Sequence, residues 1–345
     1  MYKLVFITGA SGFLGAHVAQ LLLEKGYRVR ASARAAKVDY VKEGFASFGD
    51  KLEVVTVEDI ATSDMTQALA GVDAIVHVAA PLARRGGPDV LMSGAIGGTL
   101  NVLRQGYAAG VRKFVLTSSI VTAFDTKQLD REEPLTDQDW NPGTIEEAFN
   151  SKDPGFVYSV AKTAAEKEAW KFADEKGDVD VTTLNPPFLW GPFASSFPHP
   201  APNSSALSTN YYIFQLLDKE HGAYPRWPGW ADVRDVAQAH VLALETDTLP
   251  SVPHKRILIS GEWLDYAKVG RYIAAQRPEV KDRIVDPEKA PTLVAGWRVD
   301  MTRSKELFGL GREDLRTWKV TLLETVDVAL RLEKEWAAQG VVLEM

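Results

Sequence analysis

Short apolar runs alternate with longer amphipathic stretches along the first two thirds of the chain. Short runs rich in β-branched residues are typical of strands, and apolar positions three and four residues apart are typical of helices. Near-continuous apolar strands separated by helices indicate a parallel sheet covered on both faces. The pattern predicts strands over 3–7, 27–32, 52–56, 74–79, 113–117 and 179–184, and helices over 12–25, 65–70, 89–109 and 156–176.

The pattern changes after Asn185. Prolines recur through residues 186–202 and forbid a long regular element there. Aromatic residues cluster next, before a helix expected over 233–244 and a strand over 257–260 that would return to the sheet. A last amphipathic helix is expected over 320–336. The chain is therefore expected to form a doubly wound α/β parallel sheet from 1–185 with 232–260, and a smaller C-terminal lobe from 186–231 with 261–345.

Composition and charge restrict the class of protein. The chain has 345 residues, of which 46% are hydrophobic and 25% charged, as in ordinary soluble enzymes. The formal charge of −7 disfavours nucleic acid or an anionic membrane as the main partner. The absence of cysteine excludes disulfides, thiolate metal sites and a cysteine nucleophile, and the histidines lack metal-ligand spacing. No targeting or membrane-spanning segment is recognisable, so a cytoplasmic location is expected. The acidic stretch 127–155 is expected to be a solvated surface loop.

The N-terminal segment LVFITGASGFLG carries the strongest functional signal. An apolar strand stops at Gly9, glycines recur at Gly12 and Gly15, and a helical stretch follows. In a dinucleotide site, one glycine makes the tight turn, one lets the backbone approach the pyrophosphate, and one lets the helix pack against the strand. Helix N–H groups then face the phosphates. This order favours a cofactor-binding interpretation over simple turn chemistry.

A tyrosine and a lysine are placed for proton transfer. Tyr158 and Lys162 are four residues apart on an expected helix, so they share one face. A nearby ammonium favours the phenolate and would lower the tyrosine pKa from its ordinary value near 10. The pair thus suits general acid–base exchange between a hydroxyl and a carbonyl. Ser118 and Ser119 follow an expected strand at the end where ligands bind, although serines there also serve turns.

Together these features resemble an extended short-chain dehydrogenase/reductase (SDR), a family with a Rossmann-type dinucleotide-binding domain and a substrate-binding lobe. Within that family, the chain is similar to the carbonyl reductases related to dihydroflavonol reductase, cinnamoyl-CoA reductase and the fungal methylglyoxal and ketone reductases. The resemblance is carried by TGASGFLG (8–15), VHVAAP (76–81), VLTSS (115–119), DWNP (139–142), YSVAK (158–162), LNPPFLWGP (184–192) and WADVRDVAQAH (230–240).

The resemblance implies the catalytic roles. Ser119 would hydrogen-bond the substrate oxygen, and Tyr158 would donate the proton in reduction. Lys162 would lower the tyrosine pKa and hold the nicotinamide ribose. Many members add an asparagine from a preceding helix, but Ile96 and Gly97 stand at that place, so the role stays unassigned here.

The second strand indicates NADPH rather than NADH. An NAD site places an acidic residue about 20 positions after the glycines, whereas an NADP site places an arginine there. No acid ends this strand, and Arg34 follows it directly, with Lys37 as a weaker helper; the alternative is a solvated surface charge. The resemblance completes the expected cofactor-binding set: Thr8, Gly9, Ser11, Gly12, Phe13, Leu14, Gly15, Arg34, Lys37, Asp59, Ile60, Ala79, Ala80, Thr117, Tyr158, Lys162, Pro186, Phe188 and Leu189.

A small carbonyl compound is the expected substrate, and no metal is required because the cofactor carries the hydride. The protein is expected to act as a monomer or homodimer. Two alternatives are an NADP-dependent sugar-nucleotide epimerase or dehydratase, disfavoured by few cations after Asn185, and a non-catalytic NADP-binding regulator, disfavoured by the complete triad. The expected substrate contacts are Pro81, Leu82, Ser119, Ile120, Phe124, Trp190 and Phe193.

Overall fold

The computed structural model describes residues 3–80, 87–126, 133–225, 227, 229–247, 254–292, 298–341 and 343. A seven-stranded parallel sheet in the order β3-β2-β1-β4-β5-β6-β9 forms its centre. The strand order reverses between β1 and β4, and ligands bind outside the carboxyl ends of strands at such a switch point. The expected α/β fold is confirmed. The strands are β1 (Leu4–Thr8), β2 (Arg28–Ala33), β3 (Leu52–Thr56), β4 (Ala74–His77), β5 (Lys113–Thr117), β6 (Asp180–Asn185) and β9 (Lys255–Leu258).

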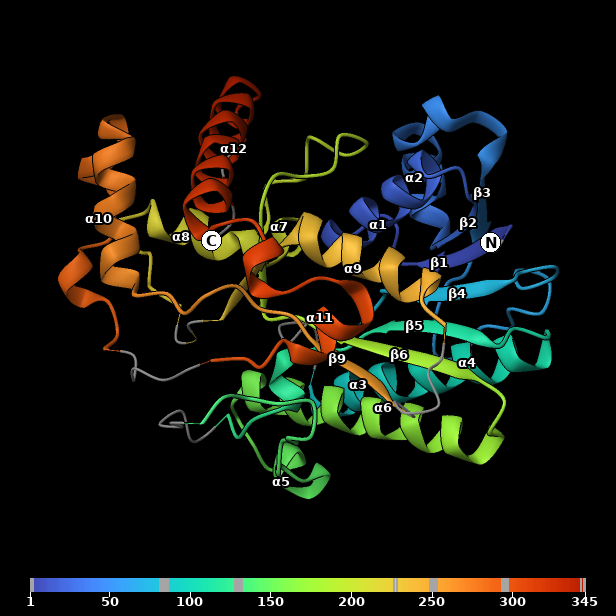
Figure 1. Ribbon diagram of the computed structural model, residues 1–345. Coiled ribbons are helices and arrows are strands. Elements are labelled where there is room, and N and C mark those ends of the chain that lie inside the picture. The colour runs from blue at the N-terminus through green and yellow to red at the C-terminus, as the bar shows by residue number, and fades with distance from the viewer. Residues whose placement is uncertain are drawn as a thin grey trace.

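Helices cover both faces of this sheet (Figure 1). One face carries α1 (Phe13–Glu24), α2 (Val38–Gly44), α9 (Val233–Glu245) and α11 (Thr302–Phe308). The other face carries α3 (Pro88–Met92), α4 (Gly98–Ala108), α5 (Ile145–Phe149) and α6 (Pro154–Lys176).

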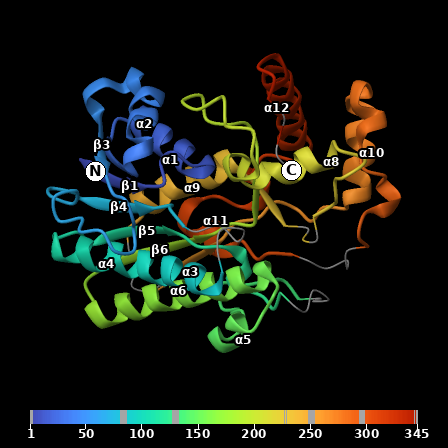
Figure 2. The same ribbon diagram turned by 180° about the vertical axis from the view of Figure 1, so that it is seen from behind.

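A smaller C-terminal region lies at one end of the sheet, where α8, α10 and α12 gather (Figures 1 and 2). Its own apolar core contains the stacked rings of Trp190 and Trp230 and the ring of Phe214 against Trp336. Its elements are β7 (Phe188–Trp190), α7 (Ser204–Leu207), α8 (Tyr211–Leu216), β8 (Trp230–Asp232), α10 (Tyr266–Gln276) and α12 (Trp318–Ala338).

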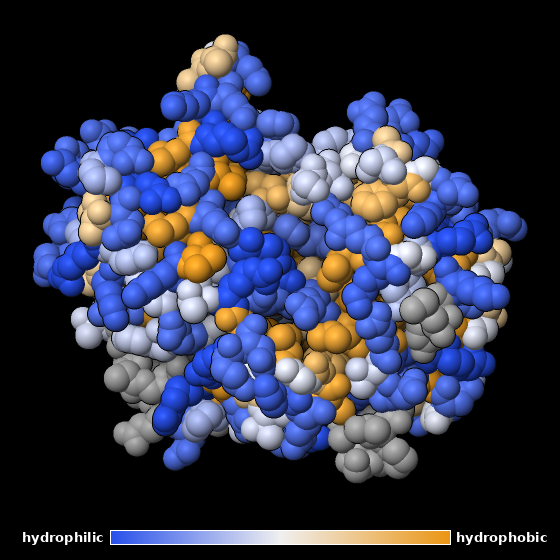
Figure 3. All heavy atoms as spheres, turned by 45° about the horizontal axis from the view of Figure 1, so that its top comes forward, coloured by the Kyte–Doolittle hydropathy of each residue, from blue (hydrophilic) through white to orange (hydrophobic). Residues whose placement is uncertain are grey.

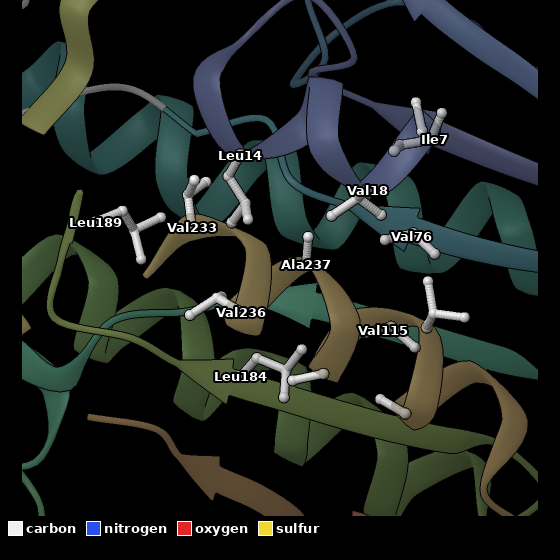
Figure 4. Close-up of a cluster of buried hydrophobic side chains, with 14 of the residues drawn as sticks. Ile7, Leu14, Val18, Val76, Val115, Leu184, Leu189, Val233, Val236 and Ala237 are labelled. Atoms are coloured by element: carbon white, nitrogen blue, oxygen red, sulfur yellow. The ribbon is translucent and has the colours of Figure 1, made fainter. Parts of the chain in front are cut away.

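The largest core lies between the sheet and the pair of helices α1 and α9. Val18 of α1 and Ala237 of α9 face the strand side chains of Ile7, Val76 and Val115 (Figure 4). These residues are fully buried or nearly so. On the outer surface, hydrophilic side chains cover most of the face in Figure 3, and hydrophobic ones form smaller patches between them. The two-sided burial explains why the central strands β1 and β4 are almost entirely apolar.

Two segments differ from the sequence expectations. Residues 66–70 form turns rather than a helix, because a single turn from Met65 to Leu69 runs into Gly71, whose φ of +70° ends it. The described part of 127–155 is not simply a surface loop. Leu135 is buried and forms a parallel bridge to Val299, and the stretch contains α5.

The crossing of α1 over β1 depends on Gly15. A Cβ at this position would overlap the carbonyl oxygen of Gly9. We therefore expect Gly15→Ala to lower the free energy of unfolding by about 1–3 kcal/mol through overpacking, measured by urea denaturation. The matched control is Gly87→Ala, where an added Cβ has no atom within 4 Å. Equal stabilities of the two variants would contradict this account of the glycine.

Candidate active site

The turn between β1 and α1 has the geometry of an anion cradle. Gly9 has a φ of +78°, and a Cβ there would lie 2.9 Å from the Ala79 amide nitrogen. Gly12 caps α1 without any side-chain hydrogen bond, and Ser11 and Gly12 are exposed. The first N–H groups of α1 therefore face outward at the carboxyl edge of the sheet. This arrangement fits the pyrophosphate of a dinucleotide.

Thr8 and His77 join the end of β1 to the end of β4. The Thr8 hydroxyl accepts hydrogen bonds from the amides of Val78 and Ala79 at 3.1 and 3.0 Å. It lies 2.8 Å from His77 Nδ1, to which it donates. Burial, and then the nearby Lys162 charge, lower the pKa of His77 to about 3. This histidine is therefore a neutral packed residue that supports the turn.

The end of β2 presents two cations to solvent. Arg34 follows the last residue of β2 and is exposed, and Lys37 lies 4.7 Å from the centre of the Tyr40 ring. The Glu58 carboxylate is also close, because it accepts a hydrogen bond from the Ala35 amide at 2.9 Å. Its charge offsets part of the positive field at this edge.

The segment after β3 forms a turn beside the same edge. Asp59 Oδ1 accepts a hydrogen bond from the Ala61 amide at 2.8 Å, and the Ile60 carbonyl accepts one from Asn101 at 3.0 Å. Asp59 is exposed and Ile60 is partly buried. Both of these expected cofactor-binding residues are thus held in a defined turn.

The three expected catalytic residues converge at the carboxyl end of β5. Ser119 lies two residues after β5, and its side chain is near enough to Tyr158 to influence the pKa of the phenol. Tyr158 and Lys162 lie on one face of α6. The Lys162 ammonium donates to the carbonyl oxygen of Thr117 at 2.8 Å, which fixes its position against β5.

The electrostatic environment of the pair differs from the sequence expectation. Burial raises the pKa of Tyr158 above its ordinary value of 10, and the hydrogen bond with Ser119 opposes this rise. Burial lowers the pKa of Lys162 to about 8, and the charge of Glu166 opposes this fall. The phenol is therefore protonated at neutral pH. This direction is opposite to the expected lowering of the Tyr158 pKa, because desolvation is the largest effect on the phenol.

A buried carboxylate network behind the site was missed at the sequence level. Glu166, one turn beyond Lys162 on α6, forms an ion pair with Arg256 of β9 at 2.6 Å. The Asn185 amide at the end of β6 donates to Glu166 at 2.7 Å. The spacing of Tyr158, Lys162 and Glu166 in steps of four would have placed all three on one face.

The Thr117 side chain is held from the opposite face of the sheet. Its hydroxyl lies 2.7 Å from Nε2 of His240, a buried residue of α9. The other ring nitrogen lies 2.8 Å from the Val236 carbonyl, to which it donates. Burial lowers the pKa of His240 to about 4. Thr117 is thus anchored on both sides, by Lys162 at its carbonyl and by His240 at its hydroxyl.

The remaining expected contacts line the boundary between the sheet and the C-terminal region. Ile120 and Phe124 are buried, and the Phe124 ring lies 5.0 Å from that of Trp227. Phe193 is partly buried and packs edge-on against Phe13 at the start of α1, at 5.1 Å. Trp190 is only 1% exposed and lies in the C-terminal core.

Other members of the expected set have defined places. Pro186 is buried, and its carbonyl accepts a hydrogen bond from the Ile120 amide at 3.0 Å. Phe188 and Leu189 belong to β7. Leu14 is buried in α1, and Ala80 is exposed beyond β4. Pro81 and Leu82 lie outside the described residues.

No group of three or more histidine, aspartate or glutamate side chains among the described residues could hold a metal ion. Within the same ranges, no helix is long and apolar enough to cross a membrane.

The fold and the site together define a class of protein. Residues 5–256 match the NAD dependent epimerase/dehydratase family, and the chain belongs to that family. It is an extended SDR related to methylglyoxal and cinnamoyl-CoA reductases.

Proteins similar to this chain along nearly its whole length are oxidoreductases. An uncharacterized oxidoreductase of Schizosaccharomyces pombe is 34% identical over 315 residues, covering 88% of this chain and 91% of that protein. A ketoreductase of Aspergillus niger is 32% identical over 334 residues, covering 91% and 95%. The NADPH-dependent methylglyoxal reductase of Saccharomyces cerevisiae is 29% identical over 352 residues, covering 95% and 98%.

Solved structures agree with this placement. The yeast methylglyoxal/isovaleraldehyde reductase complexed with NADPH superposes with a TM-score of 0.82 at 26% identity, covering 96% of this chain and 99% of that one. Vestitone reductase from alfalfa gives a TM-score of 0.72 at 26% identity, covering 96% and 98%. A UDP-glucose 4-epimerase from Thermotoga maritima, with a TM-score of 0.70 at 19% identity over 95% and 99%, shares the fold alone.

Proposed function

We propose that this protein is an NADPH-dependent carbonyl reductase that transfers a hydride to a ketone or an aldehyde. The observation that carries the proposal is the convergence of Ser119, Tyr158 and Lys162 at the carboxyl end of β5, where the Lys162 ammonium donates to the Thr117 carbonyl at 2.8 Å. The glycine turn supplies a cradle suited to the dinucleotide. The similar yeast structure was solved with NADPH, which supports the same cofactor here.

The bound cofactor supplies the hydride. The residues of this chain orient the carbonyl and move the proton. In our proposal the Ser119 hydroxyl binds the carbonyl oxygen and Tyr158 Oη donates a proton to it as negative charge develops. Because burial raises the pKa of Tyr158, this donor is protonated at neutral pH. Lys162, held by the Thr117 carbonyl, adds a positive charge beside the developing anion and binds the ribose.

The substrate is proposed to lie against the apolar boundary between the sheet and the C-terminal region. Ile120, Phe124 and Phe193 are the side chains we assign to it. Trp190 is buried in the C-terminal core and would support this wall from behind. An apolar pocket with a few polar groups suits a hydrophobic carbonyl compound.

The test is NADPH oxidation against a panel of ketones, aldehydes and sugar nucleotides, followed at 340 nm. We expect turnover with ketones or aldehydes and none with sugar nucleotides. Turnover of a sugar nucleotide would favour the epimerase or dehydratase alternative. Cofactor binding without turnover of any compound would favour a regulator that binds the nucleotide only.

Arg34 is proposed to select the 2′-phosphate. A charge-assisted contact of a guanidinium with phosphate is worth about 1.5–3 kcal/mol. Arg34→Ala is therefore expected to raise the KM for NADPH by roughly 10- to 100-fold, toward the lower end because Glu58 is close, and to leave the KM for NADH nearly unchanged. The measurement is parallel kinetics with both cofactors.

The matched control for this prediction is Arg28→Ala. Arg28 is an exposed arginine at the opposite end of the same strand, β2. It should change neither KM. The assignment of Arg34 fails if the wild-type protein prefers NADH, or if the alanine variant weakens both cofactors equally.

A further inference from the structure

Glu166 is a buried charge that the proposed proton transfer does not use. It lies on α6, four residues after Lys162 and eight after Tyr158, so the three side chains share one face of the helix. Its carboxylate is almost fully buried, at 3% exposure. A buried carboxylate persists only where it is paired and hydrogen-bonded, and it must therefore be held by several partners.

Those partners come from three neighbouring strands of the sheet, β5, β6 and β9. The Glu166 carboxylate accepts a hydrogen bond from Ser118 after β5 at 2.5 Å and from Thr183 of β6 at 3.2 Å. Asn185 donates to it at 2.7 Å, and Arg256 of β9 at 2.6 Å. The group therefore joins the carboxyl ends of β5 and β6 to the edge strand β9.

The same network reaches the backbone of the candidate catalytic serine. The Thr122 hydroxyl lies 2.8 Å from Glu166 Oε2 and 2.9 Å from the carbonyl oxygen of Ser119. The Asn185 amide also lies 3.3 Å from that carbonyl oxygen. Two of the groups that hold Glu166 thus also hold Ser119 in the extended conformation that begins the following turn.

Glu166 and Lys162 also share a cavity. A void of about 20 Å³, lined in part by both side chains, lies between α6 and the ends of β4 and β5. Because both side chains are buried, the attraction between their charges is weakly screened. The Glu166 charge raises the pKa of Lys162 against the lowering by burial. The titratable and charged groups that face Lys162 and Glu166 are His77 of β4, Tyr158 of α6 and Arg256 of β9.

We propose that Glu166 is a positioning residue that keeps Lys162 charged and fixes the backbone of Ser119. This inference rests on the proposed function, because it deepens the role of the same site. Arg256 in turn holds Glu166, and its guanidinium donates to the carbonyls of Asp137 and Asp139, at 3.0 and 2.5 Å, and covers the Trp140 ring at 3.9 Å. These contacts fix the position of Arg256 and, through it, that of the Glu166 carboxylate.

The test follows the titration of Lys162 in the protein without cofactor. It distinguishes an effect of the Glu166 charge from a purely structural effect of the side chain. Lysine labelled with ¹³C at Cε is followed by NMR from pH 6 to 11, and Lys162→Met identifies the resonance. The wild-type side chain is expected to titrate near its pKa of about 8. In Glu166→Gln, loss of the attracting charge should lower this pKa by about one unit. Glu166→Asp keeps the charge and should titrate as wild type.

The kinetic counterpart is the pH profile of kcat for carbonyl reduction. Reduction requires Lys162 charged, so activity should fall as pH rises through the Lys162 pKa. The alkaline limb should therefore move about one unit to lower pH in Glu166→Gln and stay in place in Glu166→Asp. If the wild-type protein reduces no carbonyl, the proposed function fails, whereas the NMR titration still decides the role of Glu166.

The control is a second buried carboxylate that also pairs with an arginine but lies outside this network. Asp235 of α9 is equally buried and pairs with Arg316. Asp235→Asn should reduce stability without moving the Lys162 titration. The proposal is overturned if Glu166→Gln titrates at the wild-type pH, or if Asp235→Asn shifts the titration equally. A one-unit drop of the Lys162 pKa in Glu166→Asp would also overturn the proposal. This measurement remains possible even if the glutamine variant does not fold.

Discussion

Tyr158→Phe is expected to abolish most reductase turnover while leaving cofactor binding intact. The substitution keeps the ring on α6 but removes the hydroxyl that Ser119 contacts. Loss of a positioned general acid is typically worth about 10² to 10⁴ in rate. We therefore expect kcat to fall by that factor at saturating NADPH. The dissociation constant for NADPH, measured by nucleotide fluorescence, should change little, because the proposed cradle for its pyrophosphate is the glycine turn.

Tyr27→Phe provides the matched control. Its hydroxyl donates to Glu245 at 3.0 Å, and it precedes β2 at the end of the sheet opposite the site. This variant loses a hydrogen bond of similar kind and should retain wild-type kcat, with a small loss of stability. Near-wild-type reduction by Tyr158→Phe would exclude Tyr158 as the acid.

Lys162→Met is expected to affect turnover and cofactor affinity together. Methionine keeps much of the buried stem but removes the ammonium that Thr117 holds. Loss of a charge-assisted hydrogen bond of about 1.5–3 kcal/mol predicts roughly 10- to 100-fold weaker NADPH binding. Turnover should fall further, since the charge beside the developing anion is lost.

The pH profile distinguishes the contribution of Lys162 to proton transfer from its contribution to cofactor binding. The wild-type alkaline limb, expected near pH 8 from the pKa of Lys162, should disappear in the methionine variant. Lys171→Met, an exposed lysine on the same helix, is the control and should change neither limb nor affinity. If only cofactor affinity changed and the limb stayed in place, Lys162 would have no electrostatic role in proton transfer.

Local signals explain which parts of the fold could be predicted from the sequence. The bounds of β3 and β5 are those expected, since each is a short run with valine and other strand-forming residues. Strand β4 ends at His77, two residues earlier than expected, because the Thr8 hydroxyl takes the following amides away from strand pairing. The helix expected over 65–70 does not form, because Gly71 ends its first turn. Where the end of a strand or helix depends on residues outside it, its bounds cannot be predicted from its own sequence.

The candidate site was predictable only where its residues are close in sequence. Tyr158 and Lys162 are four residues apart, and Ser119 follows a recognisable strand. The Glu166 ion pair joins residues 90 positions apart, and no local pattern links them. The long stretch around Leu135 was likewise interpreted as solvated because its partner Val299 lies far along the chain. Pairings between distant residues, such as these two, leave no pattern in the neighbouring sequence.

The position of Arg256 in β9 has a consequence for the folding of this protein during synthesis. A growing chain that has left the ribosome only as far as α9 already carries the glycine turn, the serine, the tyrosine and the lysine. Its Glu166, however, lacks its guanidinium partner, and an unpaired buried charge costs about 3–5 kcal/mol. The active site is therefore expected to become complete in the same folding step in which β9 joins the sheet. The dinucleotide half cannot be treated as an exchangeable module, because any C-terminal half grafted onto it would have to return a strand bearing that arginine.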